Sequence, residues 1–213
     1  MDTTDRPGPV KATITVSLDG YITGPDDRAG QGLGVGGERL HHWVMGGPWT
    51  YESDREPGAG MTDADRAYFD AVLAGTGAGL CGRGMYDSSG GWGGRNPFGG
   101  TLVVLTHRTA DRPDPGTGFR MVDGFDEALA AAREEAGGAG VAIGGGADVI
   151  RQALAAGVVD ELGITTAPVV LGRGKRLFEG FDHDVDLDIL SVHHSPYAVH
   201  VRYAVRRPRS RRR

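Results

Sequence analysis

The sequence predicts an α/β domain with a central, mostly parallel β-sheet, flanking helices and antiparallel C-terminal edge strands. Short apolar runs rich in β-branched residues alternate with helical patterns along most of the chain. Glycines, 37 in all, cluster between these segments, as expected of loops that join strands to helices. The last quarter instead contains strand-like segments with no helical pattern between them, which indicates antiparallel strands at one edge of the sheet.

The chain has 213 residues, of which 39% are hydrophobic and 24% charged, and this composition is typical of a single globular domain. We expect a disordered leader at 1–10, one domain at 11–205 and a disordered, arginine-rich tail at 206–213. No signal peptide is recognisable, and no apolar run approaches the ~20 residues that cross a membrane. With a single cysteine, Cys81, and hence no intrachain disulfide, a cytoplasmic protein is expected. Without its arginine-rich tail the chain has a clear excess of acidic residues, which disfavours nucleic-acid binding.

The first strand and the first helix carry the clearest local signals. Lys11–Leu18 is a β-branched run that ends at the turn pair Asp19-Gly20. A long glycine-rich loop follows at 24–60, with one apolar cluster that suits a short helical stretch. Thr62 is a good N-cap for the next helix, because Asp65 stands where it completes a capping box.

Strands and helices then alternate through the middle of the chain. The expected strands are short and apolar, at Ala78–Cys81, Thr101–Thr106, Phe119–Val122 and Val141–Ile143. Apolar residues recur at helical spacing in 125–136 and 147–157, which predicts two helices there. This alternation is typical of right-handed crossovers in a parallel sheet.

Three further strands are expected near the C-terminus, at Glu161–Leu171, Val185–Val192 and Tyr197–Val205. The last of them alternates cleanly and is apolar on one face. We expect it to be an exposed edge strand. Pairing with a second copy would protect such an edge, so the sequence predicts a homodimer.

The strongest candidate site is the strand-to-helix junction Ile143-Gly144-Gly145-Gly146-Ala147-Asp148. A helix N-terminus offers unpaired N–H groups and the positive end of the helix dipole. Glycines without Cβ let a diphosphate approach that backbone. A tight glycine turn without a ligand is the alternative interpretation.

Two more candidate contacts follow expected strands. Thr106-His107-Arg108-Thr109 places hydroxyls beside a guanidinium, which suits a phosphomonoester such as the 2′-phosphate of NADP. Gly82-Arg83-Gly84 follows another strand in the same way. Because the carboxyl ends of parallel strands meet at one edge of a sheet, the three segments are expected to lie together. Solvated loops with ordinary surface arginines are the alternative.

Asp19 and Asp65 are the candidate catalytic carboxylates. Asp19 directly follows the first strand, although Asp-Gly is also a common turn. Asp65 lies in the first turn of its helix, where a role as capping partner is equally expected. Trp43 and Trp92 lie in glycine-rich loops, and would either stack on a planar substrate or form a small loop core.

Several other chemistries are not supported. The letters Gly32-x-Gly34-x-x-Gly37 match a dinucleotide fingerprint, but no apolar strand precedes them. The adjacent histidine pairs His41-His42 and His193-His194 chelate poorly, so no metal site is expected. The motifs of zinc deaminases and of serine hydrolases are absent from the sequence.

Taken together, five segments resemble, in order, the dihydrofolate reductase-like superfamily. The segments are Ile14–Ile22, Leu80–Tyr86, Val103–Arg108, Ile143–Gly146 and Leu171–Phe178. The nearer resemblance is to the branch that includes the C-terminal reductase domain of the bifunctional riboflavin biosynthesis protein, over Lys11–Val205. The run 65–69 looks like the segment that binds pterin in folate reductases, but one residue more separates it from Gly82. The long loop 24–60 has no matching counterpart there, so folate is not favoured.

The resemblance implies a dihydrofolate reductase-like fold with NADPH across the carboxyl ends of the strands. Its diphosphate would lie on Gly144 to Gly146, with the Gly144-Gly145 peptide in the cis form. The resemblance further implies that the adenosine phosphate end is held by Arg83, Thr106, Arg108 and Thr109. It places the nicotinamide and the substrate beside Ser17, Asp19 and Tyr21.

These observations predict an NADPH-dependent reductase that transfers a hydride to a C=N or C=O carbon of a small heterocyclic substrate, pterin-like or pyrimidine/ribosyl-like. The alternative is a non-catalytic nucleotide- or pterin-binding protein of the same fold. A flavin-using reductase is a third reading.

Overall fold

The computed structural model describes residues 7–111 and 113–206. The strands are β1 (Val10–Ser17), β2 (Tyr21–Thr23), β3 (Thr76–Gly82), β4 (Thr101–Leu105), β5 (Phe119–Val122), β6 (Gly140–Gly145), β7 (Glu161–Ala167), β8 (Lys175–Arg176), β9 (Leu187–His194) and β10 (Val199–Val205). The α-helices are α1 (Asp63–Leu73), α2 (Arg83–Ser88), α3 (Phe125–Glu135) and α4 (Ala147–Ala155). Two short 3-10 helices are η1 (Gly37–His41) and η2 (Gly90–Gly94).

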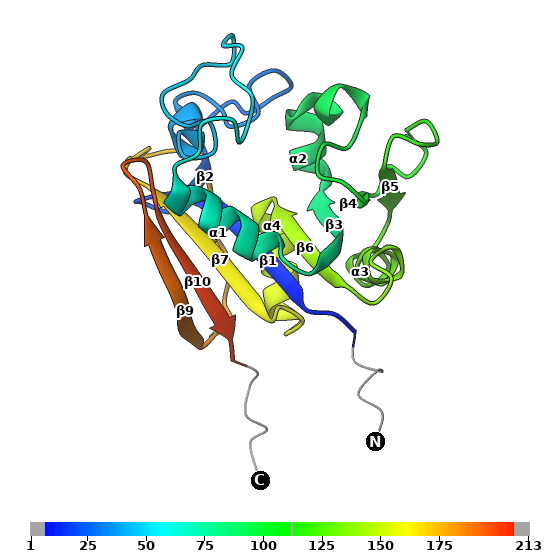
Figure 1. Cartoon of the computed structure of the whole chain (residues 1–213). Helices are drawn as coiled ribbons and strands as arrows, with labels where there is room; N and C mark the ends of the chain where they lie inside the picture. Colours follow the sequence, from blue (N-terminus) through cyan, green and yellow to red (C-terminus); the bar gives the residue numbers. More distant parts are fainter. Residues whose placement is uncertain (1–6, 112, 207–213) are drawn as a thin grey trace.

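Eight strands form one sheet in the order β5-β4-β3-β6-β1-β7-β10-β9 (Figure 1). Neighbours from β5 to β7 pair in parallel, and β10 and β9 are antiparallel. Strands β2 and β8 form a small separate sheet. The α/β class with a mostly parallel sheet and antiparallel C-terminal strands is therefore confirmed.

Helices cover both faces of the sheet. Apolar residues of α3 and α4 pack with one set of alternating strand residues, including Ala12, Leu80 and Ile143, to form the main core. On the opposite face, α1 and η1 cover the half of the sheet around β1 and β7, while α2 and η2 cover β3 and β4. Strand residues point alternately to the two faces, so the inner parallel strands bury side chains on both sides, while the residues of the edge strand β5 are half-buried.

The N-terminus of α1 follows the predicted chemistry. The Thr62 hydroxyl accepts from the backbone N–H of Asp65, whose carboxylate accepts in return from the Thr62 N–H. This capping box fixes the start of the helix. Tyr68 and Val72 on the inner face of α1 are buried, which fixes its rotation on the sheet.

Two expectations about the ends of the sheet are wrong. Tyr197–Val205 is not the edge strand, because β10 lies between β7 and β9 and is paired on both sides. The free edge on this side is β9. The leader was expected to extend to residue 10, but Val10 begins β1 and the carbonyl of Pro9 accepts from the N–H of Val141. Of the terminal segments expected to be disordered, residues 1–6 and 207–213 lie outside the described residues.

The helical stretch expected in the long loop is present as the 3-10 helix η1, which buries Leu40. No helix within 7–111 or 113–206 is both long and apolar enough to cross a membrane.

Candidate active site

Four parallel strands, β4, β3, β6 and β1, lie side by side and carry the predicted site segments at their carboxyl ends. This edge lies at the top of Figure 1, close to α2 and the long loop 24–60. The arrangement brings together the segment after β4, the Gly82-Arg83 start of α2, the glycines of β6 and the end of β1. The predicted convergence at one edge of the sheet is therefore present.

The junction between β6 and α4 is open toward this edge. Gly145 has a φ of +130°, which favours glycine, and a Cβ there would also lie 3.2 Å from the Met85 sulfur. A Cβ at Gly146, by contrast, would meet no heavy atom within 4 Å. Gly146 is the N-cap of α4 and no side chain in the described part of the chain caps the helix, so its first turn can donate N–H groups to an anion. The cis peptide is Gly145-Gly146, one residue later than the resemblance implied.

Other residues of this junction act through the backbone or the core. Ile143 is completely buried and Ala147 is 7% exposed, so both position the turn. The Asp148 carboxylate accepts from the Gln152 amide at 2.8 Å and lies 3.5 Å from a guanidinium nitrogen of Arg151. These contacts hold its side chain along the exposed side of α4.

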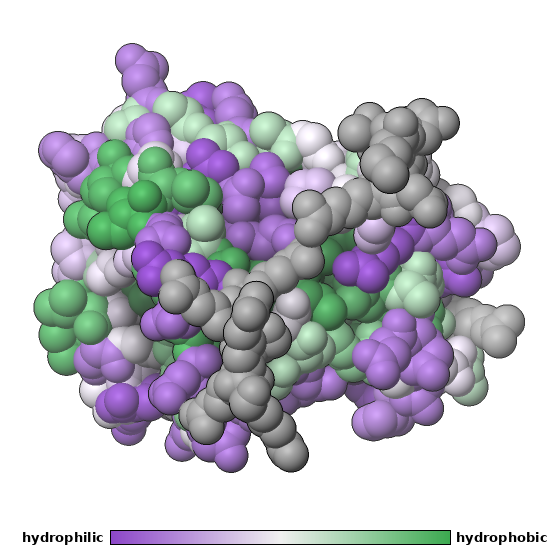
Figure 2. Space-filling view, turned by 90° about the horizontal axis from the view of Figure 1, so that it is seen from below, coloured by the Kyte–Doolittle hydropathy of each residue, from purple (hydrophilic) through white to green (hydrophobic). Residues whose placement is uncertain are grey.

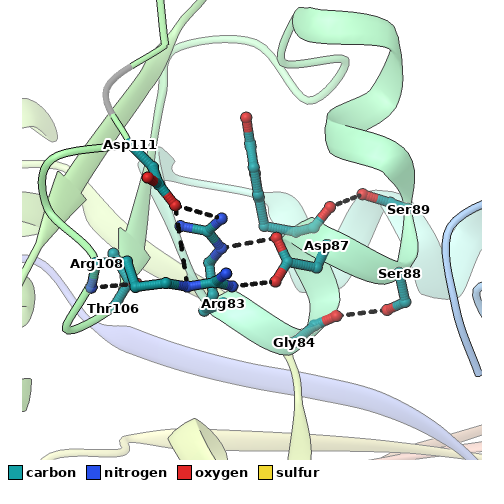
Figure 3. A network of polar contacts seen from close by, with 9 residues as sticks. Arg83, Gly84, Asp87, Ser88, Ser89, Thr106, Arg108 and Asp111 are labelled. Carbon is teal, nitrogen blue, oxygen red and sulfur yellow. Dashed lines mark hydrogen bonds and ion pairs between the residues drawn. The ribbon is translucent and has the colours of Figure 1, made fainter.

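Arg83 and Arg108 converge from α2 and from the loop after β4 (Figure 3). Arg83 Nε donates to Asp87 Oδ1 at 2.7 Å, and Arg83 Nη2 donates to Asp111 Oδ2 at 3.0 Å. Arg108 Nη2 donates to the other oxygen of Asp87. Partial burial lowers the pKa of Arg83, but the two carboxylates outweigh it and raise that pKa overall, so the guanidinium stays charged.

The remaining predicted residues of this loop have distinct positions. Thr106 is buried, and its hydroxyl accepts from the backbone N–H of Arg108 at 3.0 Å, which shapes the turn. Thr109 is half-buried in the same loop. The His107 side chain is 92% exposed and pairs with Asp123. His107 therefore points away from the arginine pair.

Asp19 is tied to two segments at the end of β1. Its carboxylate accepts from the Ser17 hydroxyl at 2.6 Å and from the backbone N–H groups of Leu171 and Gly172 at 3.0 and 2.7 Å. The Ser17 bond is the largest cause that lowers the pKa of Asp19 to about 2, and the two backbone bonds add to it. Asp19 is therefore ionised at neutral pH. Tyr21 is buried beside it, with its hydroxyl donating to the Gly172 carbonyl at 3.1 Å.

Asp65 is not placed to act on a substrate. It is completely buried, and besides its capping bonds, Oδ1 lies 2.8 Å from Nε2 of the equally buried His200. The other ring nitrogen of His200 lies 2.9 Å from the Thr165 hydroxyl. Burial lowers the pKa of His200. The neutral tautomer that donates from Nε2 to Asp65 satisfies both contacts. The capping interpretation of Asp65 describes the structure, and the catalytic one does not.

Trp43 belongs to the same buried network and not to an open pocket. It is 7% exposed, its indole N–H donates to the Thr15 hydroxyl at 3.1 Å, and its ring packs edge-on against His200. Trp92 is half-buried and stacks on Phe119 at 6.1 Å between ring centroids. The loop-core alternative fits both tryptophans, so the prediction that Trp43 binds substrate is wrong.

Sequence reasoning did not single out Asp87, Asp111 and His200. Asp87 follows Arg83 by four residues, a spacing that pairs side chains on a helix, but the six-residue α2 is too short to give a helical pattern. Asp111 and His200 reach their partners only through the tertiary fold, and no local signal marks them.

A cavity of about 190 Å³ next to β1 was also not foreseen. Six residues line it: Arg39, His42, Pro168, Val169, Pro196 and Tyr197. The backbone N–H of Leu18, at the end of β1, donates to the carbonyl of Val169 in its wall at 2.8 Å. The cavity therefore lies on the β7 side of the end of β1, beside the predicted site.

No group of three or more metal-ligating side chains occurs in the part of the chain that the structure describes. Cys81 is buried, and burial raises the pKa of its thiol to about 12. This thiol is therefore not a nucleophile at neutral pH.

Comparison with known families gives a single clear result. The model of the RibD C-terminal domain matches residues 9–201. The chain belongs to the RibD C-terminal domain family. No curated protein sequence matches the chain significantly.

Solved structures with similar folds share little sequence with this RibD-family chain. A protein of Shewanella sp. PV-4 that is provisionally assigned to riboflavin biosynthesis has a TM-score of 0.67 and 20% identity, covering 93% of this chain and 99% of that one. Dihydrofolate reductase from Enterococcus faecalis, solved with NADP(H) and RAB-propyl, has a TM-score of 0.54 and 18% identity, covering 93% and 97%.

A third similar structure is the diaminohydroxyphosphoribosylaminopyrimidine deaminase/5-amino-6-(5-phosphoribosylamino)uracil reductase of Thermotoga maritima. It has a TM-score of 0.57 and 14% identity, covering 93% of this chain and 56% of that longer one. The dihydrofolate reductase-like fold and the resemblance to the riboflavin branch are thereby confirmed.

Proposed function

We propose that the protein is an NADPH-dependent reductase that transfers a hydride to a C=N or C=O carbon of a small pterin-like or pyrimidine/ribosyl-like heterocycle. One observation carries the proposal. The open N-terminus of α4, Arg83 and Arg108 lie at the carboxyl ends of three adjacent strands, β6, β3 and β4. This order supports the proposal, because it would suit a diphosphate and a phosphate along one line at the sheet edge.

The residues present fit such a cofactor. Space at Gly146 is free, and α4 lacks a side-chain cap, so the first-turn N–H groups are available to a diphosphate. One guanidinium nitrogen of Arg83, Nη1, is buried without a hydrogen-bond partner among the described residues. A buried donor of this kind is costly unless a ligand or water satisfies it. NADPH bound here would supply the hydride.

The chain itself binds and orients. The glycine junction and the two arginines would hold the two phosphate-bearing parts of the cofactor, while the cavity beside β1 would receive the substrate. Asp19 is ionised at neutral pH and so would accept a hydrogen bond from a substrate N–H and stabilise positive charge near the ring. The proton that accompanies the hydride would then come from water, since Asp19 cannot donate one at neutral pH.

A second function, a nucleotide- or pterin-binding protein without turnover, is favoured by one observation. Of the two predicted catalytic acids, Asp19 is ionised and Asp65 is buried. Neither provides a proton donor to a substrate. Binding and turnover must therefore be measured separately.

Titration with NADPH, followed by tryptophan fluorescence and by calorimetry, tests binding. Loss of NADPH absorbance with pterin and pyrimidine substrates tests turnover. Saturable binding with substrate-dependent oxidation supports the reductase. Binding without oxidation of any candidate supports the non-catalytic alternative. No binding of NADPH contradicts the reductase, and no binding of any nucleotide or pterin contradicts the alternative as well.

We also infer a homodimer, formed through β9 and not through β10 as the sequence suggested. Among the described residues, strand β9 pairs on one side only, and it exposes Ile189, Leu190 and Val192 at 67%, 49% and 56%. Figure 2 shows hydrophobic surface at its left, the side on which β9 lies in Figure 1. An unpaired apolar edge is a template for pairing with another strand, and a second copy satisfies it with closed symmetry.

A further inference from the structure

The two arginines at the predicted adenosine end are already engaged by carboxylates. Asp87 bridges them, because one of its oxygens accepts from Arg83 and the other from Arg108 (Figure 3). Asp111 bridges them again, with Oδ2 at 3.0 Å from Arg83 Nη2 and 3.9 Å from Arg108 Nε. Within the described part of the chain, these are the ion pairs that the two arginines form.

The four side chains together carry no net charge. Two guanidiniums and two carboxylates alternate in a closed arrangement, so the field that an incoming anion meets is much weaker than that of two free arginines. Of the N–H groups that would fork onto a phosphate, those of Arg83 Nε and Nη2 and of Arg108 Nη2 are used by carboxylate oxygens of similar geometry, whereas the buried Arg83 Nη1 is not. A 2′-phosphate would either displace an aspartate or approach it with like charge.

The ion pairs between these four side chains can open. The Asp87, Asp111 and Arg108 side chains are 45%, 52% and 58% exposed, so water can replace each bond. Asp87 is held in α2 four residues from Arg83, whereas Asp111 lies in the loop after β4. The loop carboxylate is therefore the one that can move aside.

We propose that Asp87 and Asp111 determine cofactor specificity by acting as internal anions at the adenosine end, so that the chain discriminates only weakly between dinucleotides with a 2′-phosphate and with a 2′-hydroxyl. The proposal rests on the proposed function, since it concerns the same cofactor site. NADPH and NADH both bind, and their dissociation constants differ by less than about tenfold. Strong preference for the phosphorylated form requires removal of the carboxylates.

The test compares wild type with Asp111→Asn and Asp87→Asn. Calorimetry measures the dissociation constants of NADPH, NADH, 2′,5′-ADP and 5′-AMP, the last two reporting on the adenosine end alone. The matched control is Asp114→Asn, which removes the same charge from an exposed position nearby that forms no ion pair with either arginine. Circular dichroism checks that each variant is folded.

We expect the preference for 2′-phosphorylated ligands to rise roughly tenfold in Asp111→Asn and to rise in Asp87→Asn, with no change in Asp114→Asn. A wild-type preference above about tenfold, an unchanged ratio in Asp111→Asn and Asp87→Asn, or an equal rise in the control would each overturn the inference while leaving the reductase proposal intact. If none of the four ligands binds to any variant, the proposed function fails and the inference fails with it.

Discussion

The surroundings of Asp19 keep its carboxylate ionised, so it can accept a hydrogen bond but cannot donate a proton at neutral pH. Three donors, the Ser17 hydroxyl and two backbone N–H groups, surround its oxygens and lower its pKa from 3.8 to about 2. The same bonds tie the end of β1 to residues 171–172. The group is thus a fixed negative charge at the end of β1, and it also joins two segments of the site.

The first prediction concerns Asp19→Asn. The folded-state pKa is lowered, so this group stabilises the fold above its unfolded pKa of 3.8, and that contribution is lost as pH falls toward about 2. In the variant, the melting temperature at neutral pH falls and the loss of stability between pH 4 and pH 2 becomes shallower. Thermal melts across this range measure both. If the melting temperature of the variant depended on pH between 4 and 2 as steeply as that of the wild type, Asp19 would not be held as described.

A second prediction concerns His200, which is buried between Asp65 and Thr165. Because burial lowers its folded pKa, the unfolded chain takes up a proton below pH 6.5 that the folded chain resists. Stability therefore decreases as pH falls below 6.5. His200→Gln keeps a polar side chain and makes the free energy of unfolding less dependent on pH between 7 and 5.

Urea unfolding at pH 7 and at pH 5 measures the slope of the free energy of unfolding against pH. His41, whose pKa burial lowers to about 4, contributes in the same direction, so the slope shrinks without vanishing. His194→Gln, at an exposed position at the end of β9, is the matched control and leaves the slope unchanged. Equal slopes for wild type and His200→Gln would contradict the neutral, buried state of this histidine.

Strands and helices were predicted well from the sequence where the residues of the segment itself favour that structure. Thr62 and Asp65 define the start of α1 by a capping box, and the β-branched run before Asp19 defines β1. The short α2 and η1 carry no such pattern, so the sequence offered a helical stretch near the apolar cluster of the long loop and a helix or turn at Gly82-Arg83-Gly84 without bounds for either. Their conformation depends on packing against the sheet, which a local signal does not record.

The third prediction concerns the N-terminus of α4. In Gly146→Ala the added methyl enters the open space in front of the helix, so the fold and melting temperature are kept but NADPH binds roughly tenfold or more weakly. Gly145→Ala is the contrast, since φ is +130° and the Met85 sulfur is close, and it lowers the melting temperature instead. Calorimetry and thermal melts separate the two effects. Unweakened NADPH binding in Gly146→Ala would place the diphosphate elsewhere.

For the whole molecule, the parallel order of strands was the most informative part of the prediction. It brought Gly144–Gly146, Arg83 and Arg108 to one edge before any tertiary contact was known. It did not reveal that Asp87 and Asp111 would occupy the arginines, or that β10 would insert between β7 and β9. Both depend on contacts between residues far apart in the sequence, which periodicity and spacing do not encode.

The fourth prediction concerns assembly. Ile189→Lys places a charge on the exposed edge strand β9, so the homodimer dissociates to monomers that retain their fold. Light scattering after size-exclusion chromatography measures the mass of each species. Val35→Lys, at an exposed apolar residue in the long loop, is the control and stays dimeric. A wild-type protein that is monomeric at all concentrations would rule out the dimer.

The most direct measurement is a crystal structure of the protein grown with saturating NADPH. The account requires the diphosphate to accept hydrogen bonds from the first-turn N–H groups of α4, with the adenosine end beside Arg83 and Arg108 and the nicotinamide near the end of β1. Clear density for NADPH at another place, with no ligand at the N-terminus of α4, would contradict it.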